Sequence, residues 1–159
     1  MAADAKQKED VKVLLRNKKA RHDYFVEDTY EAGVALLGSE VKSLREARAV
    51  MSDAYIFVKE GQAWLSQLSI TEYPWANRYN HAPKRDRRLL LHRKEIDKLD
   101  EASARQGYTL LPLEIYLKGG RIKVLLGVCK GKQQHDKRAT QKKKDADREM
   151  QAAIRKARK

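Results

Sequence analysis

Residues 111–128 read LPLEIYLKGGRIKVLLGV and carry the clearest structural signal in the chain. On both sides of the Gly119-Gly120 pair every second residue is apolar: Leu111, Leu113, Ile115 and Leu117 before it, and Ile122, Val124, Leu126 and Val128 after it. A period of two is typical of strands, so the stretch predicts an antiparallel hairpin with one apolar face. Lys123 then lies on the opposite face of the return strand. Pro112 cannot donate a ladder hydrogen bond, which favours an edge or a bulge there.

Two further segments indicate strands. Residues 24–37 are rich in aromatic and β-branched side chains, with Ala32-Gly33 near the middle, and predict either two successive strands or one strongly bent strand. Ala54–Lys59 and Gln62–Leu68 flank Glu60-Gly61 and predict a second hairpin.

Helices are expected at two places between the strands. One starts at Gly38-Ser39 and continues through Ala47, with Ser39 as the N-cap and Glu40 in the first turn. The other covers Arg93–Arg105 and ends before Gly107. Short strands with two or three inserted helices favour a mainly β fold, a small antiparallel OB-like β-barrel, because closure removes exposed sheet edges.

Charge divides the chain into a body and a tail. The 159 residues carry a formal net charge of +13, and residues 130–159 alone hold 12 Lys or Arg against 4 acidic residues. All eleven aromatic residues lie at or before Tyr116, so the tail has little with which to build a core. We expect a flexible N-terminus (1–15), a barrel (16–129) and a basic tail (130–159) that is disordered alone and helical when bound.

Several classes of protein are disfavoured. No apolar run approaches the roughly 18 residues of a membrane helix, so a membrane role is not expected. The N-terminus lacks the apolar region of a secretory signal, so we expect the protein in the cytoplasm. A lone Cys129 fits a reducing compartment, and the four scattered histidines show no metal-ligand spacing. We expect a monomer without metal or cofactor, and polyanions such as nucleic acid as partners.

Catalytic motifs are also missing. Gly127–Gln133 has three residues between its glycines where a phosphate loop needs four, and Gln133 stands where a magnesium-binding hydroxyl belongs. The chain has no nucleophile elbow and no zinc-protease motif. An enzyme is therefore not expected. The alternative of an RNA-processing nuclease would be revived only if the purified chain cleaved RNA in a metal-dependent reaction.

Two segments suit RNA. Thr71–Arg88 mixes three aromatic residues with five cations, an arrangement that can stack on bases and reach phosphates, although the same aromatics could instead pack the loop onto the barrel. Arg16–His22 forms a second basic cluster that could meet a phosphate backbone. Glu31 is either a solvated carboxylate or partner of a nearby Arg, or an acceptor for base or ribose donors. Leu90 lies in a run of three leucines, Leu89–Leu91, and is therefore expected in the core.

Several motifs from Val11 to Arg138 closely resemble the SmpB family of bacterial SsrA-binding proteins. They are NKKARHDYF (17–25), YEAG (30–33), GSEVKSLR (38–45), NHAP (80–83), RLLLH (88–92), IKV (122–124) and GKQQHDKR (131–138). Gln133 and Glu46-Ala47 depart from the usual family pattern.

The resemblance implies an OB-type barrel that grips the tRNA-like domain of tmRNA and stands in for the missing anticodon arm. With elongation factor Tu and GTP, such proteins deliver charged tmRNA to stalled ribosomes in trans-translation, while the tail occupies the empty message channel of the small-subunit ribosomal RNA. By matching position, tmRNA contacts fall on Glu31, Leu90 and Lys123. The expected site also includes Asn17, Lys18, Arg21, His22, Lys42 and Arg45.

The same match assigns decoding-centre and message-channel contacts to the tail. By matching position these are Gly131, His135, Asp136, Lys137 and Arg138. Lys132, Met150 and Ile154 are also expected in the message channel, although beyond Thr140 the tail resembles the family only in character. Small and apolar residues recur at helical spacing from Ala146 to Ala157, a stripe too thin to hold a helix alone. The alternative function is a general OB-fold ribosomal or nucleic-acid-binding protein whose tail neutralises phosphates without a decoding role.

Overall fold

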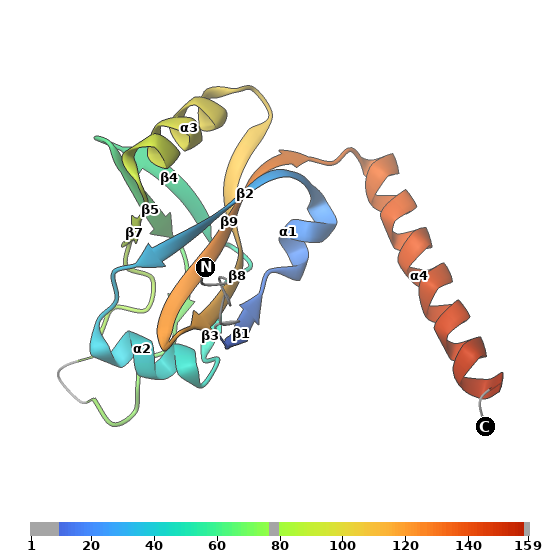
Figure 1. Cartoon of the computed structure of the whole chain (residues 1–159), viewed down its shortest axis with the longest axis horizontal. Coiled ribbons are helices and arrows are strands. Elements are labelled where there is room, and N and C mark those ends of the chain that lie inside the picture. The colour runs from blue at the N-terminus through green and yellow to red at the C-terminus, as the bar shows by residue number, and fades with distance from the viewer. Residues whose placement is uncertain (1–9, 77–79, 158–159) are drawn as a thin grey trace, which may run out of the picture.

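A computed structural model describes residues 10–76 and 80–157 of the chain. The strands are β1 (Val11–Arg16), β2 (Tyr24–Val34), β3 (Ala49–Val50), β4 (Tyr55–Lys59), β5 (Gln62–Ser66), β6 (Ser69–Ile70), β7 (Arg87–Leu90), β8 (Tyr108–Lys118) and β9 (Arg121–Gly131). The helices are α1 (Lys18–Asp23), α2 (Gly38–Arg45), α3 (Arg93–Ala104) and α4 (Gln134–Ala157). Figure 1 shows a barrel with α3 and α2 at opposite ends and α4 projecting away from it.

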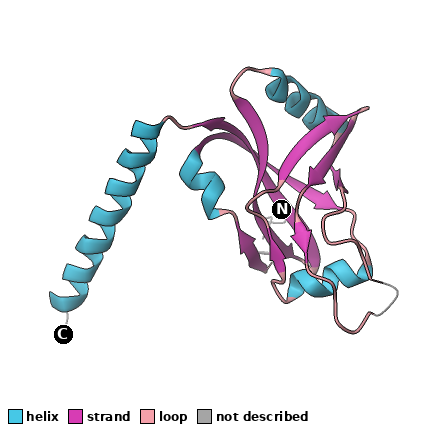
Figure 2. Cartoon of the chain, turned by 180° about the vertical axis from the view of Figure 1, so that it is seen from behind, coloured by secondary structure: helices cyan, strands magenta, loops and turns pink. Residues whose placement is uncertain are grey.

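The main sheet closes on itself. Its seven strands follow the order β1-β8-β4-β5-β7-β2-β9, and β9 also pairs with β8, so that six of them form a ring with β1 added at β8. Every pairing in the described residues is antiparallel. The expected antiparallel OB-like barrel is confirmed (Figure 2).

The hairpin predicted from residues 111–128 forms as expected. β8 and β9 pair from Tyr108 with Lys130 to Lys118 with Arg121, and Gly119 and Gly120 both take positive φ angles in the turn. The register shifts between Pro112 and Glu114, so the proline does lie at an irregularity of the ladder. The hairpin of β4 and β5 is confirmed as well.

β2 is one strand, not two. It runs from Tyr24 to Val34 and crosses the barrel as a long curved ribbon (Figure 1), with a register shift against β9 between Val26 and Asp28. Gly33 does not turn the chain, because it pairs with both Leu90 of β7 and Lys123 of β9. These two ladders hold the glycine in extended backbone.

Two local expectations are corrected. Helix α2 begins at Gly38 after Leu37, and Ser39 is not the N-cap, because its Oγ is buried and hydrogen-bonded to His81 Nδ1 at 2.8 Å. Glu40 does act in the first turn, where its Oε1 accepts from the Leu37 amide at 2.8 Å. Residues 11–15, expected in a flexible N-terminus, belong to β1, because β8 offers its free edge to them.

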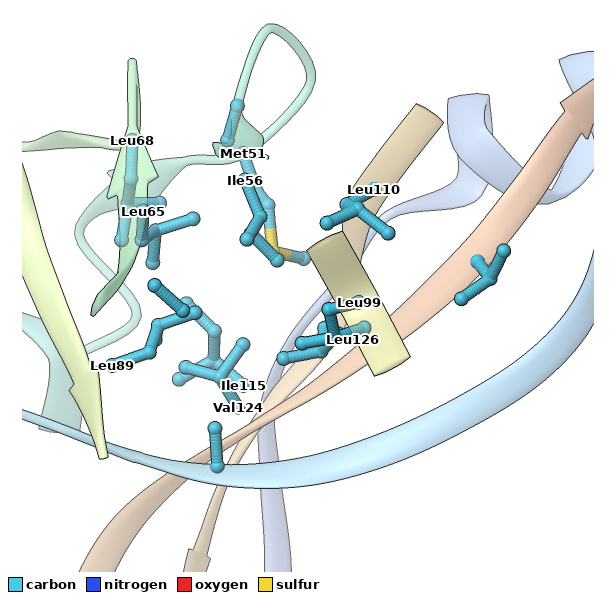
Figure 3. Packing of buried hydrophobic residues seen from close by; sticks show 14 of the residues in the cluster. Met51, Ile56, Leu65, Leu68, Leu89, Leu99, Leu110, Ile115, Val124 and Leu126 are labelled. Carbon is cyan, nitrogen blue, oxygen red and sulfur yellow. The ribbon is translucent and has the colours of Figure 1, made fainter. Parts of the chain in front are cut away.

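The core fills the barrel interior. Figure 3 shows Ile56, Leu65, Leu89, Ile115 and others pointing inward from different strands. From α3, Leu99 enters the same cluster and is fully buried. The helix thus closes one end of the barrel, and burial of its apolar residues at about 25 cal/mol per Å² holds it there.

A buried ion pair attaches β7 and its preceding loop to α2. Arg87 and Glu40 are both fully buried and hydrogen-bonded to each other, and Arg85 Nε donates to the same carboxylate at 3.1 Å. Arg87 also donates to the Leu68 and Pro83 carbonyls at 2.7 and 3.1 Å. Each of the three guanidinium nitrogens therefore donates at least one hydrogen bond, and these bonds fix β7 in place.

Candidate RNA-binding surface

Three residues from three strands meet on the outer surface of the barrel. Gly33 of β2 pairs with Leu90 of β7 on one side and with Lys123 of β9 on the other. The side chains of Leu90 and Lys123 therefore flank Gly33, which has no side chain. Glu31 lies two residues before Gly33 on the same face of β2. All four line a surface hollow of about 420 Å³. The structure thus brings together the residues that the family resemblance singled out.

Glu31 is held as an ionised acceptor. Tyr116 Oη donates to its carboxylate, and Lys118 Nζ lies 3.3 Å from both oxygens. The Tyr116 hydrogen bond, with the nearby lysines, lowers the pKa of Glu31, while burial and the carboxylate raise the pKa of Tyr116. Both oxygens still have lone pairs to accept from hydroxyl or amino donors. The partner of Glu31 is therefore a Tyr and a Lys, not the Arg considered from the sequence.

Leu90 is not a core residue. It is 50% exposed, whereas its neighbour Leu89 is 1% exposed, because successive side chains of β7 point to opposite faces. The expectation from composition was wrong here, since three consecutive leucines do not show which one faces out. An exposed leucine beside a lysine offers a sugar or base face an apolar contact.

The basic cluster before β2 forms helix α1. Asn17 is buried: its Oδ1 accepts from the Ala20 amide at 3.1 Å and its Nδ2 donates to the Pro112 carbonyl at 2.9 Å. The Asn17 side chain therefore caps α1 and ties it to β8, and its burial leaves little of it exposed for the RNA contact expected from the resemblance. Lys18 is exposed, and Arg21 lies 3.7 Å from Glu114 with half of its side chain accessible.

Asp23 connects α1 with the first turn of the tail helix. His22 Nδ1 lies 2.9 Å from its Oδ1, and Lys137 Nζ lies 3.6 Å from the same oxygen. The hydrogen bond with His22 is the main cause that lowers the pKa of Asp23. In addition, the Lys132 amide donates to the Asp23 carbonyl at 2.8 Å, and Lys132 Nζ lies 4.9 Å from the Phe25 ring centre.

Helix α2 presents a second cationic surface. Lys42 and Arg45 are exposed, and Lys42 Nζ lies 5.4 Å from the ring centre of Tyr73. They do not line the hollow around Gly33. In the loop that follows β6, the Asn80 side chain accepts a hydrogen bond from the Tyr73 amide and donates one to the Tyr73 carbonyl. Trp75 in the same loop is 81% exposed. Tyr79 lies outside the described residues.

The tail is a helix along most of its length. Gly131 ends β9, where it pairs with Tyr24, and α4 then runs from Gln134 to Ala157. The helix contains His135 and Asp136, whose side chains lie outside the described part of the chain. Arg138, Met150 and Ile154 are exposed on it, the last two at 66% and 47%.

The described residues were also compared with the requirements of a metal site and of a membrane-spanning helix. Within residues 10–76 and 80–157, no cluster of His, Cys, Asp and Glu side chains is arranged to hold a metal ion. Over the same part of the chain, every helix is too short or too polar to cross a membrane.

Known proteins resemble this chain over nearly its whole length. The model of the SmpB protein family matches residues 14–156. The SsrA-binding protein of Lactobacillus delbrueckii subsp. bulgaricus is 52% identical over 151 residues, covering 94% of this chain and 99% of the relative. That of Geobacillus thermodenitrificans is 52% identical over 144 residues, 91% and 93% of the two chains.

A solved structure shares the fold. Described as "tmRNA-SmpB: a journey to the center of the bacterial ribosome", it superposes with a TM-score of 0.65 at 42% identity, covering 76% of this chain and 85% of that one.

Proposed function

The chain belongs to the SmpB protein family, and on that premise we propose that it is an RNA-binding adaptor of trans-translation and not an enzyme. Its barrel binds the tRNA-like domain of tmRNA and delivers it, with elongation factor Tu and GTP, to ribosomes stalled in the cytoplasm. The nascent peptide is then tagged and the ribosome released. The observation that carries the proposal is the meeting of Glu31, Leu90 and Lys123 around Gly33.

These residues offer three kinds of contact in one hollow. Lys123 supplies a cation for a phosphate, Leu90 an apolar face for a sugar or base, and Glu31 an acceptor for hydroxyl or amino donors. Ionised Glu31 would repel a phosphate placed beside it. A folded RNA that places a phosphate at Lys123 and a base or ribose edge at Glu31 therefore fits better than a random polyanion.

Helix α1 forms a second contact region for tmRNA, next to the base of the tail. Lys18, Arg21 and His22 lie on α1, and Asp23 joins that helix to Lys137 of the tail. We assign Asn17 a positioning role there through its cap of α1. An RNA bound at α1 would thus fix the direction in which the tail leaves the barrel.

The tail, from Gly131 through helix α4, is the part that reads the message channel. Its contacts are Gly131, Lys132, His135, Asp136, Lys137, Arg138, Met150 and Ile154, with His135 stacking on a base of the decoding centre. Helix α4 extends away from the barrel (Figure 1), as a probe for an empty channel would. Lys42 and Arg45 of α2 add cations at the other end of the barrel.

Truncation tests this division of labour. The cut belongs after Gln133, because Gly131 completes the ladder with Tyr24 and the Lys132 amide bonds to Asp23. We expect the truncated chain to bind tmRNA with nearly unchanged affinity and to lose all tagging on stalled ribosomes. An equal loss of affinity for every RNA would instead indicate the general nucleic-acid-binding protein that the tail charge of +8 allows.

Selectivity is tested by capturing cellular RNA with the full-length chain and sequencing it. One dominant structured RNA, the tmRNA of the same cell, is expected. A broad mixture in proportion to abundance would contradict the proposal.

A further inference from the structure

The outer face of β4, β5 and β7 carries a row of large side chains that the core does not use. Phe57 pairs with Trp64 across β4 and β5, and Trp64 pairs with Arg88 across β5 and β7. These three point outward, because the residues next to them along the strands point into the barrel and are buried: Ile56, Ala63, Leu65, Arg87 and Leu89.

The row continues along β4. Tyr55 lies two residues before Phe57 on the same face, is 42% exposed, and places its ring centre 6.2 Å from that of Phe57 at an angle of 43°. Three aromatic rings thus meet on one outer sheet surface. Phe57 and Trp64 are half-buried. Grouped aromatic side chains outside a core are typical of interaction sites, and on barrel strands they are typical stacking platforms for bases.

A hollow of about 360 Å³ opens beside these rings. It is lined by Phe57, Lys59, Glu60, Gln62, Trp64 and Asp86. One lysine faces two carboxylates, so the lining does not favour a phosphate. Carboxylates accept hydrogen bonds from the exocyclic amino groups of bases, and the aromatic rings offer a face on which a base can stack.

This aromatic hollow lies next to the hollow around Gly33. Gln62 lines both of them, and Arg88, the cross-strand neighbour of Trp64, lines the first. An RNA that contacts Leu90 on β7 is therefore one strand pairing away from Trp64 on β5. A second copy of this chain is a poor occupant, because each copy carries a net charge of +13.

We propose that the aromatic hollow of Phe57 and Trp64 receives an unpaired, amino-bearing base (adenine, cytosine or guanine) of the same structured RNA that binds at Leu90 and Lys123. The base stacks on Trp64 and directs its amino group toward Glu60 and Asp86, while Arg88 lies beside it. This inference rests on the proposed function and extends its surface to strands that the family motifs do not mark.

The ring of Trp64 is the first part to test. Affinity for the tRNA-like domain of tmRNA is measured for the wild type, Trp64→Phe and Trp64→Leu in the full-length chain. We expect Trp64→Phe to bind almost as the wild type and Trp64→Leu roughly tenfold more weakly. Equal affinities for all three would overturn the proposal. If in that case the wild type still selects tmRNA, the proposed function stands; if it does not, both fall.

A fluorescence measurement covers the case in which Trp64→Leu does not fold. Trp75→Phe leaves Trp64 as the only tryptophan of the chain. A base stacked on Trp64 is expected to quench the tryptophan emission, and the RNA concentration at half-maximal quenching should equal that at half-maximal binding. Unchanged emission at saturating RNA would overturn the proposal.

The carboxylates distinguish a base from a phosphate. Glu60→Gln combined with Asp86→Asn removes two negative charges at nearly constant shape. If a base donates to them, affinity is expected to fall roughly threefold as charge-assisted hydrogen bonds are weakened. A rise in affinity would show that a phosphate occupies the hollow and would overturn the assignment of a base.

Discussion

Gly33 and Leu90 face each other across β2 and β7 so closely that a Cβ atom on Gly33 would lie 3.2 Å from the Leu90 Cβ. The missing side chain of Gly33 is what lets the Leu90 side chain lie against β2, in the same hollow as Glu31 and Lys123. The shape of the proposed tmRNA contact therefore depends on a residue that makes no polar contact of its own.

Gly33→Ala is expected to displace the Leu90 side chain and weaken tmRNA binding several-fold. The free energy of unfolding should change by less than about 1 kcal/mol, because alanine also restricts the unfolded chain. Gly38→Ala is the matched control, since a Cβ there would meet nothing within 4 Å. Filter binding and urea unfolding measure the two effects; equal affinities for both variants would exclude this role of Gly33.

Lys123→Ala should weaken tmRNA binding and lower the salt slope of the affinity by about one charge, as the loss of a single phosphate contact does. Lys144→Ala removes the same charge from the exposed tail helix and should leave the slope nearly unchanged. Binding isotherms at several salt concentrations give both slopes. An unchanged slope for the Lys123 variant would place its ammonium away from the RNA phosphates.

Glu40→Ala should destabilise the fold by about 3 to 5 kcal/mol, because it leaves Arg87 charged, buried and without its carboxylate. Glu46→Ala, in the exposed pair with Arg48, should cost less than about 1 kcal/mol. Urea unfolding at neutral pH compares them. If the two variants were equally stable, the buried pair would not be what holds β7 against α2.

The contribution of Glu40 should disappear in acid. Burial opposes its ionisation, but hydrogen bonds from Arg85, the Leu37 amide and Arg87 outweigh burial and lower its pKa below the ordinary 4.5. A lowered folded-state pKa means that the stabilisation is complete above about pH 4.5 and is lost as the pH falls through the folded-state value. The stability difference between the wild type and Glu40→Ala should therefore narrow below pH 4.5, and a constant difference would contradict this.

A peptide of residues 134–159 should show little helix in circular dichroism and gain helix when ribosomes or a polyanion are added. In the structure, the described side chains of α4 beyond Lys137 are exposed, so they supply no tertiary packing, and isolated helices of this kind are marginal in water. High helicity of the peptide without RNA would show that the tail is helical before it binds.

His135→Ala should reduce tagging on stalled ribosomes, whereas His135→Trp should be tolerated, because stacking needs an aromatic face and not a proton. Tagging of a reporter made from a message without a stop codon measures both. Binding of tmRNA in solution serves as the internal control and should stay constant. Equal tagging by the wild type and the alanine variant would exclude stacking.

Local patterns were enough to predict much of the barrel. The alternation in residues 111–128 predicted the β8–β9 hairpin and the outward direction of the Lys123 side chain, because successive side chains of a strand point to opposite faces. The helical spacing of Ile96 and Leu99 predicted α3 in the same way. The strands that were missed are short or lie at an edge, such as β1, whose partner β8 follows a hundred residues later.

The candidate site depended more on long-range contacts. Glu31 was a candidate acceptor before the resemblance was considered, but only the family motifs pointed to Leu90, which lies among leucines. The partners that hold Glu31, Tyr116 and Lys118, come from a distant strand. Asn17 was expected on the RNA, yet its amide is buried against β8.

The basic composition, the β8–β9 hairpin, the cationic tail without aromatic residues and the family motifs can all be recognised in the sequence, because composition, period and motif are properties of neighbouring residues. That Leu90 faces out, that Asn17 faces in and that Gly33 lies between Leu90 and Lys123 follows from the fold alone. The physical reason is that side-chain exposure depends on which strand pairs with which, and barrel closure joins residues that lie far apart along the chain.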